Sequence, residues 1–355
     1  MSSGWKIENA KANFHRYREQ WQSLSQRVLG CDHPLANADY VEPLLNYLGD
    51  DDVKIAVRGQ QGEDGLVLLR QLQTGVWGTF APHTGPFTFC LIPDENGSAE
   101  QAVQQLIRAL PGLVAMFTFH KLDPDHLVVH AENNPAQVQR LDYFETLQIP
   151  TDRPFDEYWS ERSRNLRRNI IKKTNRLNDH GIVWSLKQIT DPEKLPDAVR
   201  TYGEIEQRGW KGEAGTAVDI NDNSGSFYVE MLDRFAARGQ ATAYQLIFDN
   251  EPVASAITIK GCGMMVILKI TFDEAKSDYS PGLLMMYELH KVAFMDPSVE
   301  MIEYYGKATQ RAQQWAVRLR TLYHLDYYRS TLARKLIEIM RQTRSRLNKQ
   351  KDTAS

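Results

Sequence analysis

Residues 278–293 read "DYSPGLLMMYELHKVA", and the interpretation of the whole chain depends on this stretch. A polar run changes there into an apolar helix, with Pro281 and Gly282 at the change. Proline is common at the first helical position, and glycine lets a ligand approach the backbone closely. Two interpretations follow: an ordinary helix start, or one whose unpaired N–H groups and positive dipole end hold an anion such as a pyrophosphate.

Three strand-like runs lead up to this helix, and turn signals separate them. They cover residues 241–250, 252–261 and 263–272, and a further strand is expected after the helix at residues 300–305. For the rest of this half we expect helices at residues 155–178, 192–207 and 226–239, a strand at 182–189, and two terminal helices.

The first half of the chain has a similar order of elements. We expect helices at residues 13–29 and 98–110 and strands at 53–59, 65–72, 86–92, 113–119 and 126–131. Strands mixed with helices in both halves predict an α/β or α+β fold with two similar domains. The boundary is placed within residues 145–155, where Pro150 and Pro154 frame a polar turn. The predicted parts are residues 1–149, residues 150–329, and a helical tail at 330–355.

The composition is that of an ordinary globular protein. The chain has 355 residues, 42% of them hydrophobic, and a net charge of −3, which argues against nucleic-acid binding over the whole surface. Cys31, Cys90 and Cys262 are scattered, and such a sparse, odd set predicts a reducing compartment and no disulfide framework. The start lacks a signal-peptide core, and no apolar run is long enough for a bilayer span. We therefore expect a cytoplasmic protein.

Residues 161–176, "ERSRNLRRNIIKKTNR", hold seven Lys or Arg against one acidic residue. One interpretation is a face that binds an anion, either RNA or a charged cofactor. The spacing favours the other interpretation, a solvated helix face, because Leu166, Ile170 and Leu177 fall roughly on one stripe away from Arg168 and Lys172. No aromatic residue is interleaved in the run to stack on bases.

Residues 328–351 predict a basic amphipathic helix with Leu332, Leu336, Ile339 and Met340 as its apolar stripe. Packing of this stripe on the domain is the favoured interpretation. Contact with an anionic membrane surface, without any transmembrane segment, is the alternative.

Motifs of several common enzyme sites are absent from the sequence. It contains no HExxH, CxxC, GxSxG or GxxxxGK[ST] pattern. The sequence therefore indicates no metal site, no serine-hydrolase elbow and no P-loop.

Several short segments resemble, in the same order, the CelD/BcsL-type GNAT acyltransferases, whose two GNAT-like halves are also similar to Fem-type aminoacyltransferases. "HPLANADYV" at residues 33–41 looks like the family's opening turn, and residues 162–183 look like its basic helix leading into a strand. "EQRGWKGEAGTA" at 206–217 resembles its SWK-type segment, and "DYSPGLLMMYEL" at 278–289 its SPG-type cofactor loop. Together the segments extend over most of the chain.

The resemblance implies two GNAT-like domains, the first degenerate, each with a mixed, mostly antiparallel sheet flanked by helices. It implies an acyltransferase whose co-substrate is acetyl-CoA or another acyl-CoA, attacked directly by the acceptor, with no metal. Lys276 or an arginine of the basic helix would add positive charge. The residues implied at the cofactor are Leu268, Lys269 and Ile270 beside the pantetheine arm, and Ser280, Pro281, Gly282, Leu283 and Leu284 around the pyrophosphate.

For the acceptor side, the resemblance points to Trp210 and Lys211, although a core tryptophan beside a solvated lysine is an equal alternative. Glu303 is the first candidate for the catalytic base, Glu206 the second, and Tyr305 a candidate acid for the leaving thiolate. A carboxylate at a strand end is more often solvated or capping, and a perturbed pKa would be needed to favour catalysis.

The family's G-D-x-x-Y-K element has an altered counterpart in "EYYGKATQRAQQW" at residues 303–315. Gly306 is present, but Lys307 stands in place of the Asp and Gln310 in place of the Tyr. Arg311 can stand for the Lys, and we assign it to the acceptor side.

Three functions follow as hypotheses. The first is acyl transfer to an amine or hydroxyl of a saccharide or another cell-envelope precursor, an acceptor class that comes from the family alone. The second is a Fem-like transfer from aminoacyl-tRNA, which the basic helix leaves open. The third is a non-catalytic GNAT scaffold that binds RNA, membrane or a protein partner, which the altered element at residues 306–311 supports.

Overall fold

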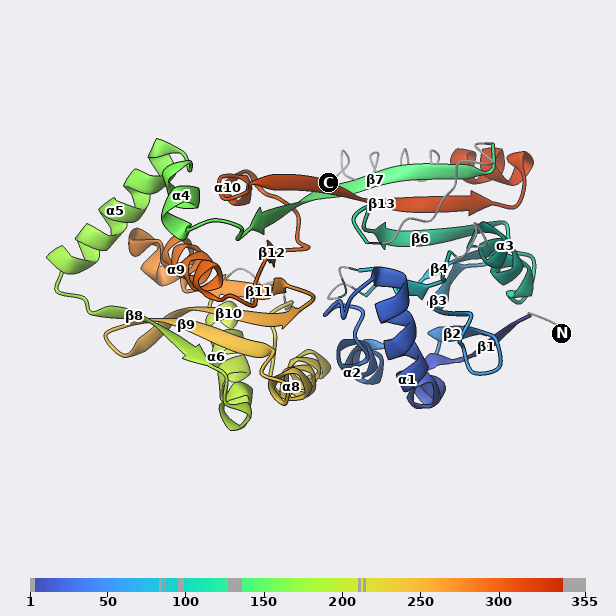
Figure 1. Cartoon of the computed structure of the whole chain (residues 1–355), viewed down its shortest axis with the longest axis horizontal. Helices are drawn as coiled ribbons and strands as arrows, with labels where there is room; N and C mark the ends of the chain where they lie inside the picture. Colours follow the sequence, from blue (N-terminus) through green and yellow to red (C-terminus); the bar gives the residue numbers. More distant parts are fainter. Residues whose placement is uncertain are drawn as a thin grey trace, which may run out of the picture. The chain divides into compact units, whose positions relative to one another are not determined.

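The structure is a computed structural model that describes residues 4–82, 85, 87–94, 99–126, 136–209, 212 and 215–340. The chain divides into two compact units that are interleaved in sequence. Unit 1 combines residues 1–30, 50–143 and 321–355, and unit 2 combines residues 31–49 and 144–320. Figure 1 labels the helices and strands of each unit.

The sheet of unit 2 is mixed and mostly antiparallel. Its strands follow the spatial order β7-β12-β11-β10-β9-β8, and only the β11–β12 pair is parallel among the described pairs. The strands are β7 (Val138–Pro150), β8 (Trp184–Ile189), β9 (Ala241–Phe248), β10 (Glu251–Gly261), β11 (Met264–Phe272) and β12 (Met301–Glu303).

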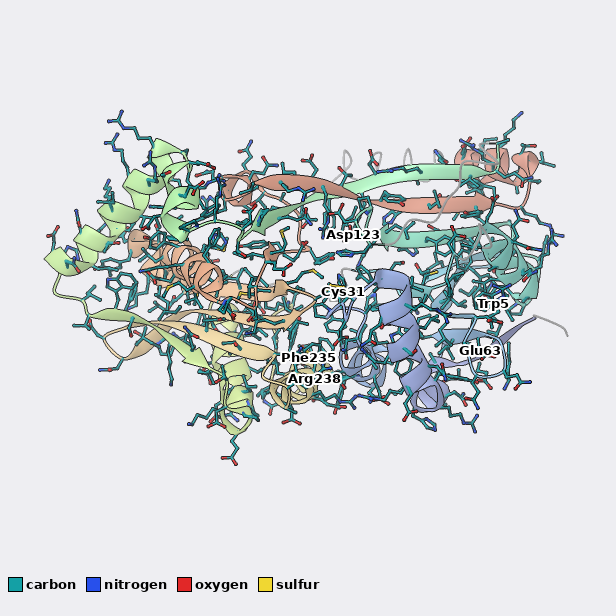
Figure 2. The ribbon with its side chains drawn as sticks, viewed as in Figure 1. Trp5, Cys31, Glu63, Asp123, Phe235 and Arg238 are labelled. Carbon is teal, nitrogen blue, oxygen red and sulfur yellow. A yellow bond between two sulfur atoms is a disulfide. The ribbon has the colours of Figure 1, made fainter. Side chains whose placement is uncertain are left out.

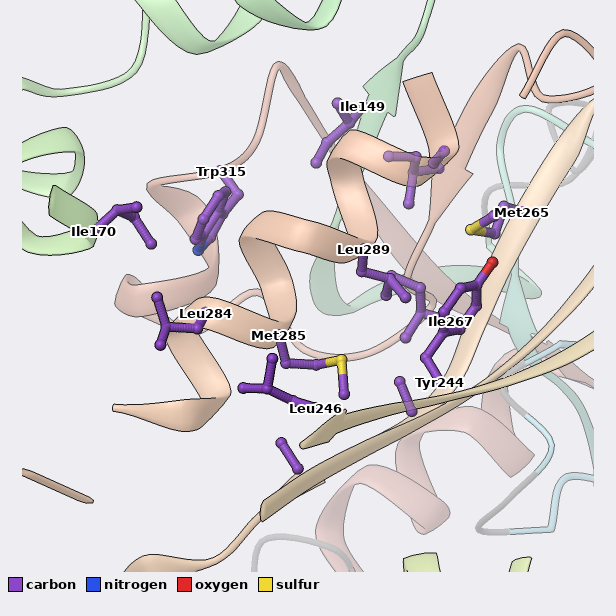
Figure 3. Packing of buried hydrophobic residues seen from close by; sticks show 14 of the residues in the cluster. Ile149, Ile170, Tyr244, Leu246, Met265, Ile267, Leu284, Met285, Leu289 and Trp315 are labelled. Atoms are coloured by element: carbon purple, nitrogen blue, oxygen red, sulfur yellow. The ribbon is translucent and has the colours of Figure 1, made fainter. Parts of the chain in front are cut away.

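Helices cover this sheet, and α9 (Pro281–Met295) contributes most to its core. Figure 3 shows Met285 and Leu289 of α9 directed at side chains of the strands, Leu246 and Ile267 among them, and Leu284 on the side of Ile170 and Trp315. The other helical elements are α2 (Ala38–Leu48), α4 (Phe155–Ser160), α5 (Arg164–Asp179), η2 (Pro192–Lys194), α6 (Leu195–Gln207), α8 (Asn223–Ala236), η3 (Glu274–Tyr279) and α10 (Gln310–Gln313).

Residues 31–49 belong to unit 2 although their neighbours in sequence belong to unit 1. Helix α2 packs on α8, and Arg234 of α8 binds Glu42 at 2.6 Å. A disulfide joins Cys31 to Cys262, with 5.5 Å between the two Cα atoms (Figure 2). The expectation of no disulfide is therefore wrong, because the fold brings together two cysteines that lie 231 residues apart in sequence.

Unit 1 repeats the pattern of an antiparallel sheet with one parallel pair. Its strand order is β1-β2-β3-β4-β6-β13, with β5 on β3 and the parallel pair at β4–β6. The elements are β1 (Trp5–Asn9), α1 (Ala10–Leu29), β2 (Lys54–Arg58), β3 (Gly65–Gln73), β4 (Val76–Thr79), β5 (Cys90–Leu91), α3 (Ala99–Ala109), β6 (Met116–Leu122), β13 (Arg318–Tyr328) and a helix at residues 331–340.

The predicted fold class is confirmed, whereas three local predictions are wrong. Helix α2 was not expected, since residues 30–40 read as turn-rich; Asn37 caps it through a bond from the Asp39 N–H at 2.8 Å. Strand β7 at residues 138–150 was not expected, and β13 occupies residues that were expected to be helical. The strand expected at 126–131 lies almost wholly outside the described residues. The boundary at residue 150 stays a prediction.

Candidate functional site

In unit 2 the parallel strands β11 and β12 separate after three residue pairs. The last pair joins Val266 to Glu303. On its other edge, β11 shifts register against β10, because Lys269 pairs with Ile257 while Ile267 pairs with Thr258. Leu268 is therefore an extra residue, a β-bulge that re-aims the strand and frees backbone groups. Half-buried Leu268, Lys269 and Ile270 lie where β12 leaves the sheet.

Helix α9 begins with a tight turn. Ser280 has a left-handed backbone (φ 53°), and its carbonyl accepts the N–H groups of Leu283 and Leu284 at 3.0 and 3.2 Å. Pro281 has no N–H, so Gly282 is the first-turn residue whose N–H lacks an acceptor within the described part of the chain. A Cβ on Gly282 would lie 2.7 Å from the Phe272 ring, so this packing alone is a reason for glycine.

The basic helix α5 reaches this turn. Lys173 Nζ donates to the Asp278 carbonyl at 2.6 Å, and Arg176 donates to the Asp278 carboxylate at 3.1 Å. His180 Nδ1 lies 2.8 Å from the Tyr279 hydroxyl. These contacts place two cations beside the residues that precede α9. Lys276 is near the same turn and pairs with Glu251 at 3.5 Å.

The other face of α5 is solvated, as its spacing predicts. Leu166, Ile170 and Leu177 are buried. Arg168 and Lys172 are exposed, and neither side chain has a hydrogen-bond or ion-pair partner among the described residues, nor does exposed Arg164. The helix therefore combines a cationic end at Asp278 with an exposed basic row.

Glu303 is fully engaged by buried partners. Its side chain is 1% exposed. Arg320 donates to both carboxylate oxygens, at 2.7 and 2.9 Å, and Gln148 Nε2 donates to Oε1 at 2.7 Å. If Glu303 takes a proton from the acceptor substrate, that proton must compete with the Arg320 and Gln148 hydrogen bonds for the carboxylate oxygens. Neither Arg320 nor Gln148 was predicted from the sequence. Only their contacts with Glu303 in the folded protein distinguish them from other arginine and glutamine residues.

Tyr305 is held in a strained conformation at the end of β12. Its φ is 49°, in the left-handed region that is uncommon for a bulky residue. The hydroxyl lies 2.9 Å from His33 Nε2, and the Arg320 guanidinium stacks 4.7 Å from the ring centroid. The Leu35 N–H donates to His33 Nδ1 at 3.2 Å, so neutral His33 carries its proton on Nε2 and the Tyr305 oxygen accepts it. Tyr305 can thus direct its own hydrogen elsewhere.

Glu206 binds within its own helix and the following loop. The Tyr202 hydroxyl donates to one oxygen at 2.8 Å and the Val218 N–H to the other at 2.9 Å. The first bond lies within α6, the second connects α6 to the loop that follows it, and the side chain is 2% exposed. This is the arrangement of a structural carboxylate.

Of the remaining acceptor-side residues the structure describes Arg311, and it shows no contact between Arg311 and Glu303. Arg311 is exposed on α10 and has no partner among the described side chains. Trp210 and Lys211 lie outside the described residues.

Sequence reasoning missed a second buried pair, His290 and Tyr304. His290 Nε2 is hydrogen-bonded to the Tyr304 hydroxyl, and His290 is wholly buried. Burial, reinforced by the positive charge of Arg162, lowers the His290 pKa to about 3, so the ring is neutral. Only its position on the inner face of α9 could have singled it out, and that pattern also fits an ordinary core residue.

In unit 1 the parallel pair β4–β6 corresponds to β11–β12 of unit 2. Beyond the last residue pair of β4 and β6, however, side chains still connect the two strands. Beyond the pairing of Gly78 with Thr118, the His120 N–H donates to Thr79 Oγ1 at 2.9 Å. The His120 ring nitrogen lies 3.1 Å from the Thr79 carbonyl oxygen. In unit 1, His120 and Thr79 thus occupy the position that corresponds to the point where β11 and β12 separate in unit 2.

The described residues contain no group of three or more His, Cys, Asp and Glu residues arranged to hold a metal ion. None of the described helices combines the length and the apolar character needed to traverse a bilayer.

The chain is similar to known proteins at the level of one domain and of the fold. Residues 164–313 match the family model described as an acetyltransferase (GNAT) domain. No curated protein sequence matches the chain.

Solved structures share the fold at low sequence identity. A structure of FemX is 13% identical, with a TM-score of 0.58, and the match covers 90% of this chain and 98% of that one. The C-terminal DUF2156 domain of a protein assigned as a lysylphosphatidylglycerol synthetase, from Agrobacterium fabrum, is 12% identical, with a TM-score of 0.55 and coverage of 91% and 96%. L-PGS from Bacillus licheniformis is 12% identical, with a TM-score of 0.51 and coverage of 91% and 96%. Residues 164–313 are therefore similar to the acetyltransferase (GNAT) domain, and the chain shares its fold with the structure of FemX.

Proposed function

We propose that the protein is a CelD/BcsL-type acyltransferase that moves an acyl group, acetyl in the simplest case, from acyl-CoA to an amine or hydroxyl of a saccharide or another cell-envelope precursor. The observation that carries this proposal is the bulge at Leu268, beside the point where β11 and β12 separate. A cytoplasmic location is part of the proposal.

The residues around the start of α9 suit the diphosphate of such a co-substrate. Gly282 offers an unpaired N–H at the positive end of a fifteen-residue helix. Lys173 and Arg176 add positive charge at Asp278, which lies three residues before the first residue of α9. The pantetheine arm would then run along Leu268, Lys269 and Ile270, whose backbone the bulge has freed. CoA supplies the activated thioester.

The chain's own groups would position the acceptor and move protons. The acceptor atom forms a bond to the carbonyl carbon, the C–S bond breaks, and the thiolate takes a proton. Tyr305 is our candidate for that proton, because His33 already satisfies its oxygen as an acceptor. Glu303 remains the first candidate base, with Glu206 second, and Trp210, Lys211 and Arg311 remain on the acceptor side.

Two observations favour alternatives. The exposed row Arg164, Arg168 and Lys172 suits a phosphodiester backbone, which supports a Fem-like aminoacyl-tRNA donor. The capture of Glu303 by Arg320 suits a scaffold that no longer catalyses.

Titration calorimetry with acetyl-CoA and with tRNA separates these functions. We expect acetyl-CoA to bind, and Lys173→Met with Arg176→Met to weaken that binding about tenfold through the loss of two charge-assisted contacts. The matched control, Arg164→Met with Arg168→Met, should leave acetyl-CoA binding unchanged.

The other outcomes of this experiment each point to one alternative function. Binding of tRNA that falls steeply with salt and is lost in the Arg164 and Arg168 variant would establish the second donor instead. Binding of neither molecule, and no CoA species copurifying by mass spectrometry, would refute both donors and leave the scaffold.

A further inference from the structure

The helix at residues 331–340 exposes a row of large apolar side chains. Leu332, Leu336, Ile339 and Met340 are 66%, 53%, 58% and 56% exposed. They are spaced three and four residues apart, so they lie on one face. The favoured expectation that this row packs on the domain is wrong.

A different residue attaches the helix to unit 1. Ile337 is 5% exposed and packs with Val76, Met116 and Tyr328. Arg334 also stacks on the Tyr328 ring, and within the helix it bonds Glu338 at 2.9 Å. A surface helix ordinarily has one apolar face, turned to the core. This helix has a second, and it faces solvent.

The charge around the row is positive. Lys335 is exposed between Leu332 and Leu336 in sequence, with no partner among the described residues. The sequence that follows, residues 341–351, contains Arg341, Arg344, Arg346, Lys349 and Lys351 and no acidic residue.

A cavity adjoins the attached face of the helix. It has a volume of about 450 Å³, and its walls include Met116 and Tyr328, the same residues that contact Ile337. Arg108 and Arg329 also line it, together with one acid, Glu100. Neither arginine side chain has a partner among the described residues, so the cavity beside the attached face of the helix carries two cations without a counter-ion.

We propose that this helix face docks on an anionic lipid bilayer, with the four apolar side chains in the interfacial region and Lys335, Arg108 and Arg329 at the headgroup phosphates. An aliphatic row flanked by cations is the composition of an interfacial helix. A nucleic acid would call for aromatic residues to stack on bases, and the row has none. A second copy of the chain would bring Lys335 toward like charge on its partner.

Vesicle co-sedimentation of the full chain tests the proposal. We expect binding to phosphatidylcholine vesicles that contain phosphatidylglycerol, weak binding to phosphatidylcholine alone, and loss of the difference at high salt. Leu336→Gln with Ile339→Gln should lower the partition coefficient roughly tenfold per residue, because each removes a buried aliphatic side chain from the interface. Arg329→Gln should lower it about fivefold.

Leu113→Gln is the matched control, since Leu113 is a 71%-exposed apolar residue of unit 1 outside the helix. It should leave binding unchanged, and all variants should melt like the parent protein. Equal binding by the Leu336 and Ile339 variant would overturn the proposal. So would a dimer in the parent protein that this variant dissociates.

Discussion

Arg320 binds both carboxylate oxygens of Glu303 and at the same time stacks against the Tyr305 ring. The pair is almost inaccessible to water, with Arg320 7% and Glu303 1% exposed. A buried ion pair of this kind need not add net stability, but removing one partner leaves a charge in a medium that solvates it poorly. The first candidate base is thus also a structural residue.

Arg320→Met should therefore lower the free energy of unfolding by about 3–5 kcal/mol, because it leaves the Glu303 charge buried without its counter-ion. The double variant Glu303→Leu with Arg320→Met should be more stable than Arg320→Met alone. Urea unfolding measures both. A double variant that is simply the sum of two destabilised single variants would mean that the two side chains act independently.

The variant Glu303→Gln distinguishes a catalytic role of Glu303 from a purely structural one. If Glu303 is the base, this variant should bind acetyl-CoA normally while turnover falls by roughly 100-fold or more. The control is Glu42→Gln, since Glu42 is an ion-paired carboxylate of the same unit, bound to Arg234, with no proposed part in the reaction. Unchanged turnover at matched folded fraction would remove Glu303 from the mechanism.

Gly282→Val should abolish acetyl-CoA binding while the domain stays folded. The added side chain would meet the Phe272 ring, which is itself 38% exposed and has room to turn outward. Calorimetry with acetyl-CoA and a thermal melt give the two readings. Normal affinity in this variant would mean that the turn at Ser280 only starts a helix.

Acid should destabilise the protein through His290. Its pKa is about 3 in the folded chain against an ordinary value of 6.5, so between these values the unfolded chain binds one more proton. The free energy of unfolding then falls as pH falls from about 6.5 towards 3, by up to about 1.4 kcal/mol per pH unit. His290→Gln should flatten this part of a urea-unfolding series against pH. An unchanged slope would mean that other titrating groups cause this pH dependence.

Thiol counting tests the disulfide. Cys90 is buried, and burial raises the pKa of its thiol to about 12, so the folded protein should react slowly with a thiol reagent. With Cys31 joined to Cys262, the denatured oxidised chain should expose one thiol and the reduced chain three. Three thiols without reductant would show that the pair is open in the isolated protein.

The sequence could predict the elements with strong periodicity and the order in which they occur. The strands β9, β10 and β11, the start of α9 and the buried stripe of α5 were all expected from local pattern. What it could not show is pairing across long distances. Arg320 with Glu303, His33 with Tyr305 and Cys31 with Cys262 are joined only by the fold, and each residue alone has an ordinary interpretation.

The interleaving of the two units has a consequence for how the protein is made. The ribosome releases residues 1–30 and 50–143 of unit 1 early, but the strand that pairs with β6, from Tyr323 to Tyr328, emerges only after residues 144–320 of unit 2. Until then β6 has an unpaired edge, which other chains could join. Emergence of β13 is therefore the moment at which the first-made unit can close. A fragment ending at residue 150 should accumulate as aggregate, and a coexpressed segment carrying residues 318–340 is the natural means to rescue it.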